Sequence, residues 1–85
     1  MNNKYRPSQS VYEMRKLRLM LKAREEILTE HIDSLKKDIL EHPDDKTLDM
    51  NLLFIEEDEV ERKAIWKVMA QLKFSIEDIT GEVEK

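Results

Sequence analysis

Residues that break helices divide this chain into two long uninterrupted segments. No glycine or proline occurs between Ser8 and His42 or between Asp44 and Thr80, and Pro43 separates the two segments. Proline disfavours helical backbone at the preceding residue and lacks an amide donor, so Pro43 marks the end of a helix. A turn near residues 42–46 is short enough to make the flanking helices antiparallel. The sequence therefore predicts an all-α fold, a long antiparallel helical hairpin.

Capping patterns set the expected boundaries of this hairpin. Ser10 and Glu13 fit a capping box, which predicts a first helix that begins at Ser10 after a flexible arm of residues 1–9. Asp44 and Asp45 suit the start of the second helix. Hairpin residues 10–74 are followed by Ser75-Ile-Glu-Asp78, which resembles another N-cap and predicts a short third helix and an acidic tail within 75–85. Gly81 is expected to end that helix.

Composition limits the classes of protein that remain. With 85 residues, of which 40% are charged and 40% hydrophobic, the chain can form one small domain. It contains no cysteine, which excludes disulfides, cysteine-ligated zinc and thiol catalysis. Its first ten residues are polar, and its longest apolar run, residues 52–55, is too short to span a bilayer. We therefore expect a soluble cytoplasmic protein with no membrane partner.

One face of the first helix is apolar along its whole length. Placed at about 100° per residue, seven side chains align on it: Met14, Leu17, Leu21, Leu28, Ile32, Leu35 and Ile39. Leu17, Leu28 and Ile39 are eleven residues apart, a spacing that favours nearly straight or weakly right-handed packing over a strict heptad. We expect a single seam in which facing residues have numbers that sum to about 88.

The second helix is apolar on two sides. One side carries Leu48, Leu52, Ile55, Trp66 and Ala70, and the other carries Met50, Phe54, Ile65, Val68 and Leu72. A helix that is hydrophobic on both sides needs more than one neighbour. We therefore expect a homodimer, in which two hairpins form a four-helix bundle, or a complex with a partner protein. A C-terminal segment folded back over a closed monomer is the third alternative.

Charge is distributed unevenly along the chain. Residues 1–24 carry seven bases and one acid, a net +6, whereas residues 25–85 carry eight bases and 18 acids, a net −10. The basic end could contact nucleic acid, with Tyr5 and Tyr12 for stacking, or dock on an acidic protein surface. A pI of 5.2 favours the second alternative. The acidic run at residues 56–61 is interpreted as a solvated helix face, with a cation site as the alternative.

Motifs for catalysis and for cofactors are missing. Neither His31 nor His42 follows a glutamate by three positions, as di-metal sites in helical bundles require. A single glycine excludes a glycine-rich phosphate loop, and no serine stands in a nucleophile motif. We therefore expect no enzymatic activity, no cofactor, no metal and no small-molecule substrate.

Three family comparisons bear on function. The pairs Glu26/Glu30 and Glu57/Glu61 resemble the acidic helices of magnesium-dependent nucleotide pyrophosphohydrolases, but the paired Glu-x-x-Glu and Glu-x-x-Asp motifs of those enzymes are absent. The chain is similar in size to small sporulation phosphatases but lacks their Ser-Gln-Glu-Leu-Asp signature. A long helix that ends in Leu35-Lys-Lys-Asp-Ile39, a polar loop and a second long helix resemble, in layout, the hairpin co-chaperones of type III secretion needle subunits.

These observations favour a non-enzymatic protein–protein interaction module, such as an adaptor, chaperone or inhibitor that occludes a larger protein. The expected contact residues are apolar side chains of the second helix and basic side chains of the first that attract an acidic partner. They are Ile65, Trp66, Val68, Met69 and Leu72, together with Arg15, Arg18 and Lys22. The alternative is a small nucleic-acid-associated regulator that uses the basic end of the first helix.

Overall fold

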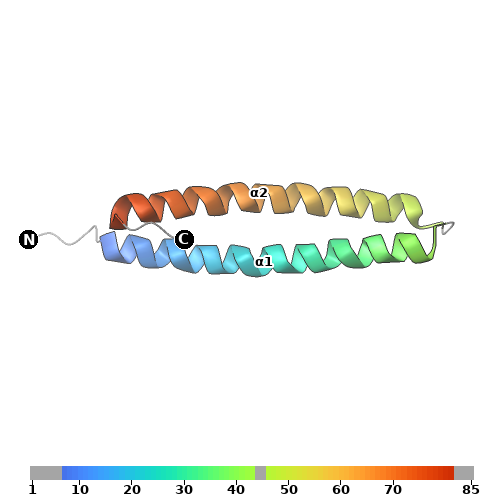
Figure 1. Cartoon of the computed structure of the whole chain (residues 1–85), viewed down its shortest axis with the longest axis horizontal. Helices are drawn as coiled ribbons and strands as arrows, with labels where there is room; N and C mark the ends of the chain where they lie inside the picture. The colour runs from blue at the N-terminus through green and yellow to red at the C-terminus, as the bar shows by residue number, and fades with distance from the viewer. Residues whose placement is uncertain (1–6, 44–45, 82–85) are drawn as a thin grey trace, which may run out of the picture.

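The protein is a rod of two antiparallel helices (Figure 1). The computed structural model describes residues 7–43 and 46–81, which form α1 (Pro7–Glu41) and α2 (Leu48–Thr80). Its extents are 68 × 25 × 14 Å and its radius of gyration is 18.6 Å, whereas a compact domain of this length would have a radius of about 12 Å. The predicted all-α hairpin and the position of its turn are confirmed.

The first helix begins earlier than the sequence analysis predicted. Pro7 is its first residue, so residues 7–9 are helical and Ser10 lies inside the helix rather than at its cap. Proline suits a first helical position, because the amide donor it lacks would have no partner there. Glu13 instead accepts a hydrogen bond of 3.2 Å from the Gln9 side chain, one turn earlier. The rest of the expected arm, residues 1–6, lies outside the described residues.

The prediction of a separate third helix is also wrong for the part of the chain that the structure describes. α2 runs through Ser75 without a break, because Ile76 and Ile79 keep its apolar edge against α1. The helix ends where predicted: Gly81 has φ +74°, and its amide donates to the Glu77 carbonyl at 2.7 Å. Glycine adopts this left-handed conformation without the steric cost that other residues incur. The expected caps at residues 44–45 and the tail at 82–85 lie outside the described residues.

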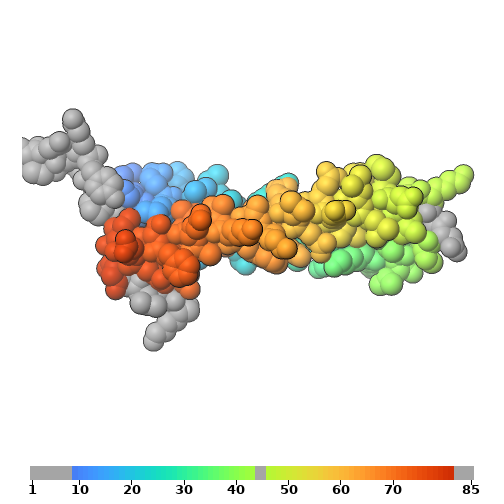
Figure 2. All heavy atoms as spheres, turned by 90° about the horizontal axis from the view of Figure 1, so that it is seen from above, coloured from blue at the N-terminus to red at the C-terminus, as the bar shows by residue number. Residues whose placement is uncertain are grey.

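The core of the hairpin is a single seam with alternating spacings of three and four residues. In α1 the buried and half-buried positions of this series are Val11, Met14, Arg18, Leu21, Glu25, Leu28, Ile32, Leu35 and Ile39. In α2 they are Leu48, Asn51, Ile55, Asp58, Arg62, Ile65, Met69, Leu72, Ile76 and Ile79. This spacing is the heptad of a coiled coil. In Figure 2, α1 emerges on one side of α2 at its start and on the other at its end, as expected for helices that coil around each other.

The heptad overturns two expectations about helix faces. Leu17 leaves the seam, at 41% exposed, and Val11 joins it, so the eleven-residue spacing does not describe the packing. The sequence predicts that α2 is apolar on two sides, but neither side is buried as a whole. The buried residues instead follow a line that starts on one side, at Ile55, and reaches the other side at Ile65. A heptad drifts by about 20° per repeat on an ideal straight helix. Over four repeats this drift splits one seam into two apparent faces.

Cross-helix contacts confirm the expected antiparallel register. Asn51 donates to Asp38 at 2.9 Å and His31 contacts Asp58, and the residue numbers of each of these pairs add up to 89. Polar side chains thus occupy seam positions and bond to partners at the seam edge. Because a shifted register would leave them buried without these partners, they specify one alignment of the two helices.

Conservative truncation of the core tests the assignment of the seam. We predict that Ile32→Val, at a side chain 1% exposed, lowers the free energy of unfolding by about 1 kcal/mol, because a buried methyl group is lost. The matched control Ile27→Val makes the same change at a side chain 56% exposed and should cost less than about 0.5 kcal/mol. Urea unfolding followed by helical circular dichroism measures both, and equal losses would contradict the assignment.

Candidate functional site

Basic and apolar side chains converge on a hollow near the open end of the hairpin. This basic hollow has a volume of about 510 Å³ and is lined by Arg15, Arg18, Leu19 and Lys22 of α1 and by Met69 of α2. The basic residues recur at three- and four-residue spacing on α1, so the helix brings them to one side. Leu19 and Met69 supply apolar surface between the charged groups. Such a hollow suits an apolar segment that also carries carboxylates.

Trp66 lies beside the basic hollow and is held in one orientation by its neighbours. Its indole N–H donates to Glu25, which also accepts a hydrogen bond from Lys22 at 3.1 Å. The Arg62 guanidinium lies over the indole ring, 4.9 Å from its centroid, and donates to Thr29 at 3.0 Å. The ring nevertheless remains 45% exposed. Trp66 is thus a large, oriented side chain that still has surface to bury.

A second hollow is lined in part by Trp66 itself. It has a volume of about 580 Å³ and is lined only by residues of α2. Its lining includes the carboxylates of Glu56 and Glu59 and the apolar side chains of Val60 and Ala64. Its basic residues are Arg62, Lys63 and Lys67. Trp66 therefore lines a hollow that contains carboxylates, and its contact with Glu25, which also binds Lys22, connects it to the basic hollow.

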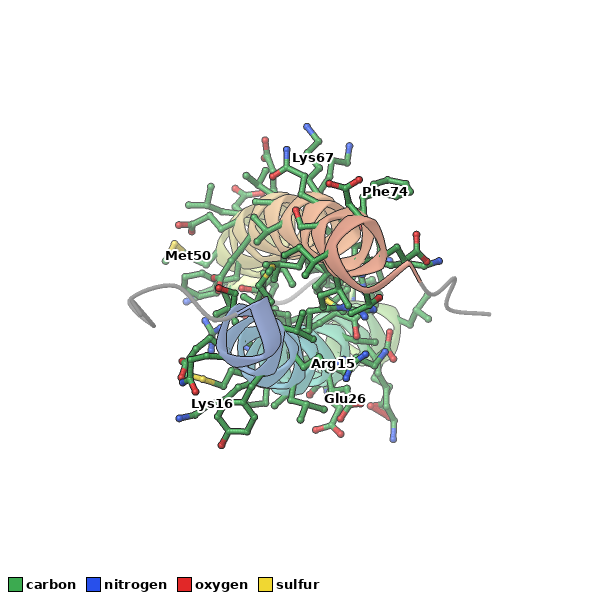
Figure 3. All side chains as sticks on the ribbon, turned by 90° about the vertical axis from the view of Figure 1, so that its left-hand side faces the viewer. Arg15, Lys16, Glu26, Met50, Lys67 and Phe74 are labelled. Carbon is green, nitrogen blue, oxygen red and sulfur yellow. The ribbon has the colours of Figure 1, made fainter. Side chains whose placement is uncertain are left out.

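We call the side of the hairpin that carries these features the tryptophan face. It includes Arg15, Lys22, Glu26 and Asp33 of α1 and Glu59, Trp66 and Lys73 of α2, all placed on one flank of the seam by the heptad. Figure 3, which looks along the rod, shows Arg15 and Glu26 on the same side of α1 and Met50 on the opposite side of the hairpin. Lys16 points away from both helices, on the outer side of α1.

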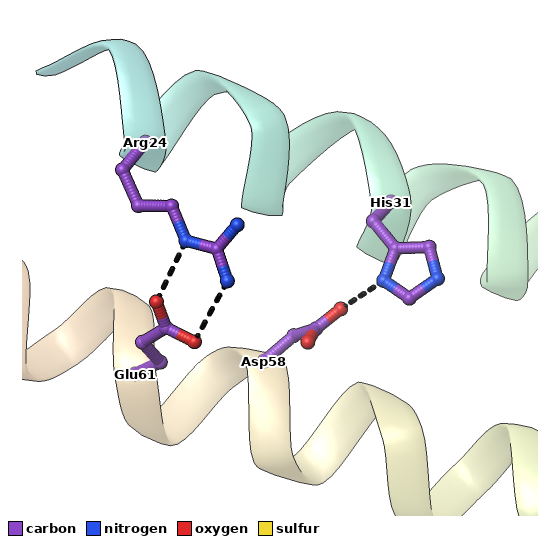
Figure 4. Close-up of polar contacts among 4 residues, drawn as sticks. All are labelled: Arg24, His31, Asp58 and Glu61. Atoms are coloured by element: carbon purple, nitrogen blue, oxygen red, sulfur yellow. Dashed lines mark hydrogen bonds and ion pairs between the residues drawn. The ribbon is translucent and has the colours of Figure 1, made fainter.

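Ion pairs across the seam shift the pKa values of several groups (Figure 4). Arg24 binds Glu61 through two hydrogen bonds of 2.8 and 3.2 Å. These bonds lower the pKa of the Glu61 carboxyl and raise that of the Arg24 guanidinium. The hydrogen bond from Trp66, followed by that from Lys22, lowers the pKa of Glu25. Glu25 therefore remains ionised around neutral pH and keeps the indole in place.

The structure brings together only some of the predicted contact residues. Arg15, Arg18, Lys22 and Met69 line the basic hollow, and Trp66 lies next to it. Ile65 is buried in the seam, and Leu72 is half-buried there. Val68 is 40% exposed but lies on the opposite flank from Trp66. The five apolar residues therefore do not form one exposed face of α2.

Sequence reasoning missed two residues of this region. Leu19 is absent from the predicted contact residues, although it lines the basic hollow. Glu25 was counted only as an acidic residue, although it orients Trp66. A heptad assignment of both helices would have indicated Glu25, because a carboxylate at a seam position requires a donor on the other helix.

Comparisons with protein families, with curated proteins and with solved structures find no significant match to this chain. Among the residues that the structure describes, no three or more His, Asp or Glu side chains are grouped so that they could hold a metal ion. Neither α1 nor α2, as described, combines the length and hydrophobicity of a membrane-spanning helix.

Lowered carboxyl pKa values make the stability of the hairpin depend on pH. A carboxyl group whose pKa is lower in the folded state stabilises the fold above its unfolded pKa, and this contribution disappears as the pH falls through the folded pKa. We predict that Glu25→Gln/Glu61→Gln flattens the fall in thermal stability between about pH 5 and about pH 3, because both lowered pKa values are removed. The variant should also be less stable than wild type at neutral pH.

The matched control for this experiment is Glu30→Gln/Glu57→Gln. It also removes two carboxylates of the hairpin, but neither has an ion pair or a hydrogen bond among the described residues. Thermal unfolding followed by circular dichroism should give the wild-type slope for the control. A wild-type slope in the Glu25/Glu61 variant would contradict the prediction.

Proposed function

We propose that this protein is a non-enzymatic protein–protein interaction module, an adaptor, chaperone or inhibitor that binds a larger protein and occludes part of its surface. The observation that carries the proposal is Trp66, a half-exposed indole fixed beside a hollow of mixed cationic and apolar character. Tryptophan and arginine dominate the energetic centres of protein interfaces. A rod with only a thin core of its own offers most of its surface for such contacts.

The local contacts of Trp66 favour tight binding. Binding normally costs about 0.5–1.5 kcal/mol for each side chain that it immobilises. Glu25 and Arg62 already restrict the indole in the free protein, so less of this cost remains when a partner covers the ring. The neighbouring hollow adds apolar contact through Leu19 and Met69.

The chemistry of the hollow points to an acidic partner surface. Arg15, Arg18 and Lys22 form a cationic rim with no carboxylate in its lining. Such a rim accelerates encounter with an acidic surface and disfavours a basic one. Nucleic acid would also be attracted by these cations, but the apolar lining from Leu19 and Met69 suits a protein surface rather than phosphate groups. We therefore favour a protein partner and treat nucleic acid as an outcome of the test.

Affinity capture from native cells, with and without nuclease, tests this function. We expect one protein in near-stoichiometric amount whether or not nuclease is present. With the purified partner, Trp66→Ala should weaken binding about 30-fold or more, as expected for the loss of a central side chain worth about 2 kcal/mol. Arg15→Glu/Lys22→Glu should mainly slow association, because these residues attract the partner from a distance.

Phe74→Ala is the matched control. It also removes an exposed aromatic ring from α2, but Phe74 lies outside the lining of both hollows and is 66% exposed. Its affinity should stay within about threefold of wild type. Circular dichroism must show that Trp66→Ala still folds. Recovery that disappears with nuclease, or equal binding by Trp66→Ala and wild type, would overturn the proposal.

A further inference from the structure

We propose that the occupant of the tryptophan face is a second copy of this chain, bound antiparallel about a two-fold axis that passes near Trp66. This inference rests on the proposed function, because it uses the same face: a second copy covers the tryptophan face when no larger protein occupies it. It goes beyond that function because both copies then use the same face, the tryptophan face, to bind each other.

Charge along the hairpin is segregated into two adjacent belts. The basic belt, residues 15–24 of α1 and 67–73 of α2, contains seven bases and no acid, a net +7. The acidic belt, residues 25–34 and 56–63, contains nine acids and two bases, a net −7. The contacts of Met69 with the basic hollow and of His31 with Asp58 place the two parts of each belt side by side.

Of the residues named on the tryptophan face, the basic belt holds Arg15, Lys22 and Lys73, and the acidic belt holds Glu26, Asp33 and Glu59. This face is therefore complementary to itself in the antiparallel orientation. Each belt is about ten residues long, or about 15 Å along the helix axis. That length exceeds the Debye length of about 8 Å at physiological salt, so a belt interacts mainly with what lies directly against it. Parallel packing would place like charges together, whereas antiparallel packing places the basic belt of each copy over the acidic belt of the other.

Individual residues of the tryptophan face obey the same symmetry. If the axis crosses α1 at residue 24, Arg15 of one copy is level with Asp33 of the other, and Lys22 is level with Glu26. If it crosses α2 at Trp66, Lys73 is level with Glu59. All three pairs are opposite in charge, and the two-fold axis repeats each of them. The axis itself passes the indole, so the aromatic side chains of the two copies approach each other at the centre.

Within one hairpin, Lys22 is already paired with Glu25 and Glu59 with Lys36, but other charges lie in less favourable surroundings. Arg18 and Lys22 are four residues apart on α1, as are Glu26 and Glu30, and like charges at this spacing destabilise a helix. Glu26, Asp33 and Lys73 form no ion pair with any residue that the structure describes. A second copy would give each of them a partner of opposite charge.

The area available is sufficient for a specific dimer. The two belts together extend about 30 Å, and two helices side by side are about 20 Å wide. The belts alone would therefore bury about 600 Å² on each copy, or about 1,200 Å² in total, which is the lower end of the range for specific interfaces. We expect a dimer with a dissociation constant in the micromolar range, which weakens as salt is added.

A charge exchange between two variants of the full chain tests the antiparallel arrangement. The first variant, Glu26→Lys/Asp33→Lys, makes this face basic in both belts. The second, Arg15→Glu/Lys22→Glu, makes it acidic in both. Each variant alone should self-associate about 100-fold more weakly than wild type, because its own copies repel each other. An equimolar mixture should restore a one-to-one dimer, since every cation then lies opposite a carboxylate.

Light scattering or sedimentation over a range of concentrations measures the mass of each variant and of the mixture in solution. A monomer has a mass of 10.2 kDa. The matched control, Lys16→Glu/Lys37→Glu, changes the net charge as much as the second variant does, but on the outer side of α1. It should dimerise within about threefold of wild type. Circular dichroism checks that each variant is folded.

Three results would overturn this inference. They are a wild-type chain that stays monomeric at every concentration, variants that each self-associate as wild type does, and a mixture that does not restore the dimer. The first result together with Trp66-dependent capture of another protein would refute the second copy and leave the proposed function intact. Loss of Trp66-dependent capture with an intact dimer would refute the proposed function as an occluder of larger proteins.

Discussion

The alternating three- and four-residue seam between α1 and α2 is the constraint on which the rest of the molecule depends. A two-helix rod has no second layer, so the six buried side chains among the described residues, Val11, Leu28, Ile32, Ile55, Ile65 and Ile76, must all come from this one line. Because the line follows a heptad, each helix keeps the same edge towards its partner along its whole length. Every side chain that is not on this line is left to flank it or to face away from it.

Polar residues in the seam convert this simple packing into one specific alignment. Arg62 and Asp58 occupy positions where a coiled coil would usually place apolar side chains, and each contacts a residue at the edge of α1. Such contacts cost stability relative to an apolar seam, but they penalise every other register. The same polar residues also shape the surface, because Glu25 and Arg62 hold Trp66 in an exposed orientation. Register and candidate binding site therefore depend on one set of interactions.

The segregation of charge into two belts links the fold to association. In a globular domain, opposite charges on neighbouring elements can neutralise each other within one chain. Here the antiparallel hairpin places basic residues 15–24 beside basic residues 67–73, and acidic residues 25–34 beside the acidic run 56–61. Ion pairs where the belts meet, Arg24 with Glu61 and Lys22 with Glu25, neutralise part of this charge within the hairpin. An acidic partner, or a second copy in the opposite direction, would supply complementary charge for the rest.

The sequence alone determined the class of fold, the turn, the antiparallel register and the helix end at Gly81. These follow from the absence of glycine and proline, the single break at Pro43 and the apolar content of both segments, which are local properties of the chain. Only the tertiary structure decided which apolar side chains are buried. The small difference between the periods of an ideal helix and of a heptad accumulates along helices of more than 30 residues, so a projection on straight helices placed Leu17 in the seam and divided α2 into two faces. For the same reason, Ile65 lies in the core rather than on the predicted contact surface.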